Sequence, residues 1–85
     1  MIEEKKIGKI FAYFEKIGVA ALQITDDYIE IGEKVHFKGP NTDFEQEIES
    51  MQIDKKDVDY VEAGKSVGMQ ISQKVEKGDE VYKAL

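Results

Sequence analysis

Turn residues divide this chain into short segments, and this division constrains its fold more than any other feature. Six glycines interrupt the sequence at intervals that suit short strands better than long helices; they are Gly18, Gly32, Gly39, Gly64, Gly68 and Gly78. The only proline, Pro40, lies in the segment KGPNTD. Because Gly, Pro, Asn and Asp each favour tight turns, this segment is the strongest turn signal in the chain.

Several segments between these turns have the apolar pattern of strands. The stretch VAALQIT, residues 19–25, is apolar enough for a buried strand, and the pair Asp26-Asp27 ends it. In EKVHFKG, apolar Val35 and Phe37 alternate with polar neighbours, as they do in a strand with one buried face. VGMQIS alternates in the same way, and GDEVYK combines a Gly-Asp turn with a short strand.

Two further segments are compatible with either a helix or a strand. From Ile7 to Ile17, apolar side chains follow helical i, i+3, i+4 spacing, and in NTDFEQEIESM the side chains of Phe44, Ile48 and Met51 would share a helical face. Read as strands, the first would be apolar on both faces with its glycine at a tight bend. The second would need a bulge between its last two apolar residues. From periodicity alone, mixed α/β and all-β folds remain equally open.

The composition is that of one folded domain. Eighty-five residues, of which 41% are hydrophobic and 35% charged, can bury one modest core, so residues 1–85 are treated as a single domain. The absence of cysteine excludes disulfides and thiolate chemistry. The start, MIEEKKIGKI, lacks an apolar run of signal-peptide length, and no stretch approaches the ~20 apolar residues of a membrane helix. We therefore expect a cytoplasmic protein with no membrane partner.

The charge balance argues against nucleic acid as the main partner. Twelve Lys and no Arg stand against eighteen acidic residues, which gives a formal net charge of −6. A protein that wraps a nucleic-acid backbone needs several unopposed basic side chains, and Arg supplies the bidentate contacts to phosphate and guanine. We therefore expect no DNA partner, whereas a small local contact with RNA stays open.

The triplet Gly64-Lys65-Ser66 matches the end of a nucleotide-binding P-loop. A complete P-loop has a second glycine five positions earlier, but Asp59 stands there, and its carboxylate would repel phosphate. The motif must also lead into a helix, whereas VGMQIS is typical of a strand. We expect the triplet to be a turn that leads into a strand at Val67-Gly68, and we expect no bound cofactor.

His36 is the only histidine, and its place between Val35 and Phe37 predicts that it faces outward. Without cysteine, a metal site would need this histidine together with carboxylates, and single-His sites bind zinc poorly. A solvated surface histidine is the simpler interpretation, just as the alternating glutamates of FEQEIE are typical of a solvated strand face. No pair of nucleophile and base and no calcium loop is recognisable. We therefore expect no metal site, no catalytic residue and no enzymatic activity.

Four segments that follow one another along the chain contain motifs that indicate its fold. IGKIFAYFEKIGVAALQI has a glycine in its first strand and Gly-Val at the start of its second, and YIEIGEKVHFKG has a Gly-Glu turn. FEQEIESMQIDKKDVDYVEAGKSVGM ends in Ala-Gly-x-x-Val-Gly, and VEKGDEVY contains a closing Gly-Asp strand. Together they resemble the β-barrel second domain of translational GTPases such as elongation factor Tu. The chain is most similar to small translation elongation factor-like proteins, and a similar barrel is appended to collagenase-like peptidases.

This resemblance implies an all-β fold, a single six-stranded antiparallel Greek-key β-barrel of the translation-factor domain 2 type over residues 1–85. Both ambiguous segments are then strands, and closure of the barrel removes exposed strand edges. The implied core consists of apolar residues from every strand. They are Ile10, Val19, Leu22, Ile29, Val35, Phe37, Phe44, Ile48, Met51, Val67, Met69, Ile71 and Val81.

The resemblance also implies a non-catalytic binding module without a GTPase domain, which contacts tRNA, the ribosome or a translation protein. In elongation factor Tu the corresponding barrel helps to hold the aminoacyl end of tRNA, and AGKSVG is the counterpart of a segment near that pocket. Lys65 and Ser66 are therefore the first candidates for a contact. An exposed Tyr13 beside Lys16 could stack on a base or on a partner side chain.

The alternative function is that of a protein-interaction subunit. Such a subunit would act in trans beside a catalytic chain such as a collagenase-like peptidase, as the appended barrel does in cis. Affinity purification distinguishes the two functions, because recovered RNA or ribosomes favour the first and one stoichiometric protein partner favours the second. The oligomeric state does not follow from the sequence.

Overall fold

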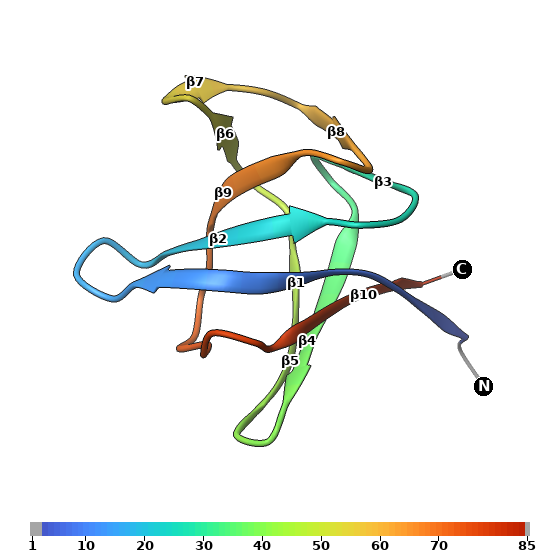
Figure 1. Cartoon of the computed structure of the whole chain (residues 1–85), viewed down its shortest axis with the longest axis vertical. Helices are drawn as coiled ribbons and strands as arrows, with labels where there is room; N and C mark the ends of the chain where they lie inside the picture. The colour runs from blue at the N-terminus through green and yellow to red at the C-terminus, as the bar shows by residue number, and fades with distance from the viewer. Residues whose placement is uncertain (1–2, 85) are drawn as a thin grey trace.

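Ten antiparallel strands form the regular structure of residues 3–84, the part of the chain that the computed structural model describes (Figure 1). Eight of them form one sheet in the order β5-β4-β10-β1-β2-β9-β6-β7, and β3 pairs with β8 in a second sheet. The expected all-β, antiparallel class is confirmed. The strands are β1 Glu4–Phe14, β2 Val19–Ile24, β3 Tyr28–Glu30, β4 Lys34–Gly39, β5 Thr42–Glu47, β6 Met51–Ile53, β7 Lys56–Asp57, β8 Tyr60–Glu62, β9 Ser66–Gln70 and β10 Glu80–Ala84.

The expected closed barrel of six strands is not found within residues 3–84. The large sheet has two ends, β5 and β7, which do not pair with each other there. The strand count is higher because the short strand β3 is separate and because the chain between Met51 and Glu62 changes direction and divides into β6, β7 and β8. Asp54 and Lys55, with φ angles of 53° and 66°, make the turn between β6 and β7. The Greek-key connectivity of the translation-factor type stays a prediction.

β1 is a central strand, because it pairs with β10 on one side and with β2 on the other. Its register shifts between Lys6 and Gly8 and again between Ile10 and Ala12. At each shift one extra residue interrupts the two-residue alternation of the strand. The spacing between apolar residues therefore resembles that of a helix. At Gly8 an added Cβ would lie 2.3 Å from the carbonyl oxygen of Gln23 in β2. The close approach of the two strands therefore explains this glycine.

The second ambiguous segment is also extended, but it is divided between two strands. β5 pairs with β4 as far as Glu47, and β6 pairs with β9 from Met51 onward. Between them, buried Ile48 donates its N–H to the carbonyl of Glu33 at 2.8 Å and accepts a hydrogen bond from the N–H of Gly32 at 2.9 Å. The change of pairing partner, rather than a bulge within one strand, explains the shifted apolar phase. Nowhere in residues 3–84 does a helix have the length and apolar character that spanning a membrane requires.

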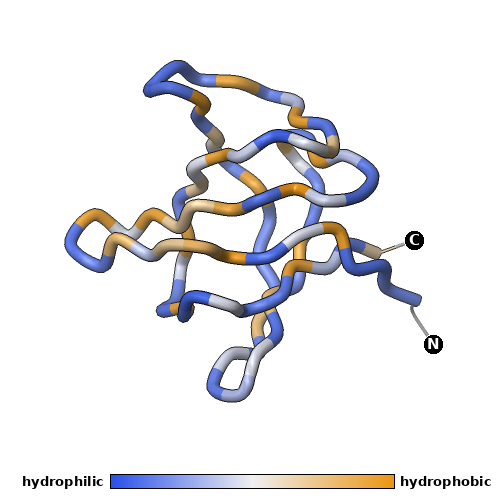
Figure 2. Tube along the Cα trace, in the orientation of Figure 1, coloured by the Kyte–Doolittle hydropathy of each residue, from blue (hydrophilic) through white to orange (hydrophobic). Residues whose placement is uncertain are grey.

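The hydrophobic core confirms the strand assignment. Every predicted core residue is buried except Val19, which is half-buried. Figure 2 shows hydrophobic segments alternating with hydrophilic ones along the strands. Burial of one such side chain contributes roughly 1.5–3 kcal/mol, so the strands are held mainly by this core. The structure adds to it Ile7, Ala20, Ile24, Val61 and Val75.

Candidate functional site

The segment with Lys65 and Ser66 is a turn followed by a strand, as expected. Gly64 has a positive φ of 94°, and β9 begins at Ser66. The hydroxyl of Ser66 donates a hydrogen bond of 2.8 Å to Oε1 of Gln23, and the carbonyl of Lys65 accepts one of 2.9 Å from the N–H of Ile24. A strand therefore stands where a P-loop requires a helix. Both predicted contact residues are exposed.

Tyr13 and Lys16 lie at the other end of β2. Tyr13 is opposite Ala20 near the start of that strand, whereas Ser66 is opposite Gln23 near its end. Tyr13 is half-buried and packs against the core, and Lys16 is exposed in the turn between β1 and β2. The structure therefore places the four candidate contact residues in two separate groups. Their roles in binding stay predictions.

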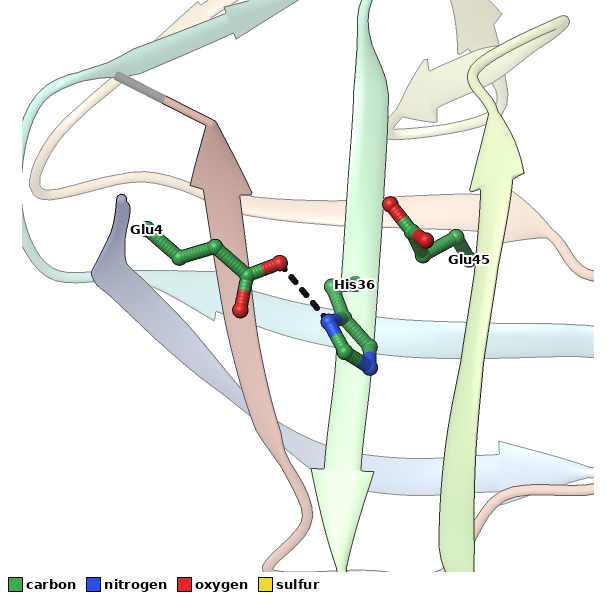
Figure 3. Close-up of side chains that lie close together, drawn as sticks. All are labelled: Glu4, His36 and Glu45. Atoms are coloured by element: carbon green, nitrogen blue, oxygen red, sulfur yellow. Dashed lines mark hydrogen bonds and ion pairs between the residues drawn. The ribbon is translucent and has the colours of Figure 1, made fainter. Parts of the chain in front are cut away.

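His36 is the centre of a polar cluster on the outer side of β1, β4 and β5 (Figure 3). Its Nδ1 lies 2.7 Å from Oε2 of Glu4, and its Nε2 lies 2.5 Å from Oδ1 of Asp43. Lys38 Nζ lies 2.8 Å from the other carboxylate oxygen of Glu4. Glu45 is the cross-strand partner of His36, and one ligand atom each from Glu4, His36 and Glu45 lie within 4.8 Å of one another. Within residues 3–84, these three side chains could together hold a metal ion.

The expectation that His36 is freely solvated is wrong, although the residue does face outward. Only 17% of its side chain is exposed. This burial by itself lowers the pKa of His36, but hydrogen bonds to Asp43 and Glu4 outweigh it and raise the pKa above the ordinary value. The pKa of Glu4 is lowered, because its carboxylate bonds to Lys38 and His36. The cluster has no signal in the sequence, because Glu4 and His36 lie on strands that are far apart in the chain and have β10 between them in the sheet.

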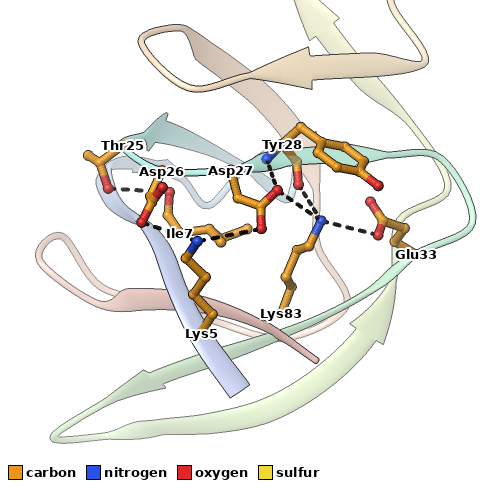
Figure 4. A network of polar contacts seen from close by, with 8 residues as sticks. All are labelled: Lys5, Ile7, Thr25, Asp26, Asp27, Tyr28, Glu33 and Lys83. Atoms are coloured by element: carbon orange, nitrogen blue, oxygen red, sulfur yellow. Dashed lines mark hydrogen bonds and ion pairs between the residues drawn. The ribbon is translucent and has the colours of Figure 1, made fainter. Parts of the chain in front are cut away.

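A second polar network joins β10 to the start of β3 (Figure 4). Buried Lys83 donates a hydrogen bond of 2.7 Å to the backbone carbonyl of Tyr28. Its Nζ also lies 3.7 Å from the centre of the Tyr28 aromatic ring. The same ammonium lies 3.4 Å from Oε2 of Glu33 and 3.7 Å from Oδ1 of Asp27. Lys5 approaches Asp27 as well, at 3.8 Å. Because Lys83 is enclosed by partners of its own chain, we assign this network a structural role.

The β1–β2 hairpin projects beyond the neighbouring strands (Figure 1) and carries exposed apolar side chains. Phe11, Phe14 and Ile17 are 42%, 52% and 66% exposed, and we call these three residues the hairpin surface. Phe11 lies at the second register shift of β1, where a bulge redirects a side chain. Exposed aromatic side chains are enriched at surfaces that contact another protein.

Comparisons of sequence relate the chain to proteases. No protein-family model matches it. The chain is 33% identical over 78 residues to an uncharacterised protease of Methanocaldococcus jannaschii and 27% identical over 78 residues to a collagenase of Porphyromonas gingivalis. Each match covers 91% of this chain but only 19% and 22% of the respective relative. The chain therefore spans about a fifth of the length of the curated relatives that it matches.

Solved structures have the same fold. The C-terminal domain of a Geobacillus thermoleovorans protein assigned to the U32 peptidases superposes with a TM-score of 0.86 at 21% identity, covering 93% of this chain and 99% of the domain. A second structure of that domain gives a TM-score of 0.85 at 19% identity, covering 95% and 92%. These findings support the peptidase side of the resemblance and do not support its translation-factor side. The chain is therefore similar in sequence to part of an uncharacterised protease and part of a collagenase, and it has the fold of the C-terminal domain of a U32 peptidase.

Proposed function

We propose that this chain is a non-catalytic interaction module that works beside a collagenase-like peptidase. One observation carries the proposal: nearly the whole chain matches about a fifth of a protease and of a collagenase. A unit that recurs within longer proteases is covalently joined to the remainder of those proteins, and we infer that it also contacts that remainder. The same fold occurs as the C-terminal domain of a U32 peptidase, which supports a role next to a catalytic domain.

The hairpin surface is the part of the module that we assign to this contact. Phe14 and Ile17 expose more than half of their side chains on a projecting hairpin, where no other part of residues 3–84 has to move for a partner to cover them. Burial of apolar side chains at the centre of an interface is the main source of affinity between proteins. The acidic remainder of the molecule, with a net charge of −6, suits a protein partner better than a nucleic-acid backbone.

Reconstitution with a truncated peptidase tests this function. The probe is the Methanocaldococcus jannaschii protease from which the 78 matched residues are deleted, mixed with this chain and followed by analytical ultracentrifugation. We expect a one-to-one complex. Phe14→Ser and Ile17→Ser should each weaken it by about tenfold, because an anchoring side chain commonly contributes more than 1 kcal/mol. Both positions are exposed, so the variants should fold.

Tyr60→Ser is the matched control. Tyr60 is 52% exposed, as Phe14 is, but it lies in β8 and stacks on Tyr28. This substitution should leave the affinity for the truncated peptidase unchanged. Failure to form any complex would contradict the proposal. Binding of purified tRNA that is lost in Lys65→Glu would instead favour the translation-factor function, in which Lys65 and Ser66 form the contact.

A further inference from the structure

We infer that Glu4, His36 and Glu45 form a site for a divalent transition-metal ion, with Asp43 orienting the imidazole ring. The site lies on the outer side of β1, β4 and β5 (Figure 3). It shares β1 with the hairpin surface, but Glu4 begins that strand and Phe14 ends it, so no residue belongs to both. The inference is therefore independent of the proposed function.

Strand pairing brings the three ligands together. His36 and Glu45 are directly opposite each other in the β4–β5 pair, and cross-strand partners have Cβ atoms about 4.5–5.5 Å apart. Glu4 approaches from β1, and its Oε2 already lies 2.7 Å from Nδ1 of His36. One ligand atom from each residue lies within 4.8 Å of the other two. Rotation of the two glutamate side chains alone could bring these atoms to the spacing that a shared ion requires.

The surroundings of the imidazole ring match those of a metal-bound histidine. Nδ1 faces Glu4 and Nε2 faces the carboxylate of Asp43. In metal sites the second ring nitrogen of a histidine usually donates its hydrogen to a carboxylate, which fixes the ring and its tautomer. Nδ1 would then coordinate the ion while Nε2–H donates to Asp43. Asp43 is thus a positioning residue and not a ligand.

The local charge also favours a divalent cation. The carboxylates of Glu4, Asp43 and Glu45 carry three negative charges, and Lys38 supplies one positive charge at 2.8 Å from Oε1 of Glu4. With a neutral His36, the cluster has a net charge of −2, which a divalent ion neutralises. Lys38 bonds to Oε1 and leaves Oε2 to face the ring. Without an ion, Lys38 offsets one of the three carboxylate charges.

The donor set selects the class of metal. An imidazole nitrogen favours Zn²⁺, Co²⁺ and similar transition metals, whereas Ca²⁺ and Mg²⁺ prefer oxygen ligands alone. Three protein ligands leave room for water at a fourth position. With one nitrogen and two carboxylates, affinity should be moderate and should follow the order of transition-metal stability, with Zn²⁺ bound more tightly than Mn²⁺.

Calorimetric titration of the metal-free chain with ZnCl₂ tests the inference. The wild type should bind one Zn²⁺. The NMR resonances of the His36 ring should shift over the same range of Zn²⁺ concentration in which binding heat is released or absorbed. His36→Gln should abolish this binding, and Glu45→Gln should weaken it by at least about tenfold. Asp43→Asn should weaken it by about tenfold, the lower end of the effect of removing a carboxylate that orients a metal-bound histidine.

Glu47→Gln is the matched control, because Glu47 is exposed on the same strand two positions beyond Glu45 and pairs with Lys34. It should bind Zn²⁺ with the affinity of the wild type. Equal weak binding by the wild type and by all four variants would identify non-specific attraction to the acidic surface and would overturn the inference. Absence of binding by a folded wild type, or tighter binding of Mg²⁺ than of Zn²⁺, would overturn it as well.

Discussion

His36 and Lys83 acquire their environments from strand pairing and not from their neighbours in the sequence. His36 meets Glu4 across 32 positions, and Lys83 meets the carbonyl of Tyr28 across 55 positions. The outward direction of His36 could be predicted from the alternation of β4. Its partners could not, because they depend on which strands lie side by side and in which register.

The stability conferred by His36 should depend on pH in the metal-free protein. Its pKa is higher in the folded chain than the ordinary value of 6.5, so its contribution is complete below that pH and is lost as the pH rises through the folded-state pKa. We expect the wild type to be more stable than His36→Gln at about pH 5.5 and this difference to shrink toward about pH 8.5. Urea unfolding with EDTA present measures it. A difference that grows with pH would contradict the assignment.

Loss of the Lys83 ammonium should destabilise the fold. Lys83→Met keeps the apolar stem but leaves the carbonyl of Tyr28 without this donor and the carboxylates of Asp27 and Glu33 without this cation. We expect the free energy of unfolding to fall by about 2 kcal/mol, as for a buried hydrogen bond to a charged group. Chemical denaturation measures this change. Lys34→Met, at an exposed position of β4, is the control. Equal effects of the two variants would show that the network does not stabilise the chain.

At the scale of elements, the strands follow from the sequence better than their pairing does. Turn residues correctly delimit the hairpin around Pro40, and alternation correctly predicts β4 and β9. β1 was ambiguous because two register shifts break its alternation, and such shifts depend on the neighbouring strands. The small β3–β8 sheet had no signal of its own, since each of its strands has only three residues.

Gly8 is the residue on which the close pairing of β1 and β2 depends. Gly8→Ala would place a Cβ 2.3 Å from the backbone oxygen of Gln23, an atom that cannot rotate away. We expect a loss of roughly 1–3 kcal/mol, the usual cost of overpacking. In Gly68→Ala the nearest atom, a methyl of Val19, would lie at 3.7 Å, so this control should be nearly neutral. Thermal unfolding of both variants measures this difference in stability. A Gly8→Ala variant as stable as the wild type would contradict the register of the β1–β2 pair.

At the scale of the whole molecule, the two proposals concern two outer surfaces of residues 3–84. One is the hairpin surface, and the other is the His36 cluster on β1, β4 and β5. The sequence resemblance pointed to a third place, the turn at Lys65 and Ser66, because the translation-factor barrel uses its counterpart. The turn is present as predicted, but the relatives found by sequence and by fold are proteases and a U32 peptidase domain.

Hydrogen exchange of this chain, alone and with the truncated Methanocaldococcus jannaschii protease, tests the central claim most directly. Amides of residues 11–18 should become protected in the complex, because the partner covers Phe14 and Ile17, which are 52% and 66% exposed in the free chain. Amides around Lys65 should exchange at unchanged rates. Protection confined to residues 63–66, or no protection in any part of the chain, would contradict the proposal that the hairpin joins this module to a peptidase.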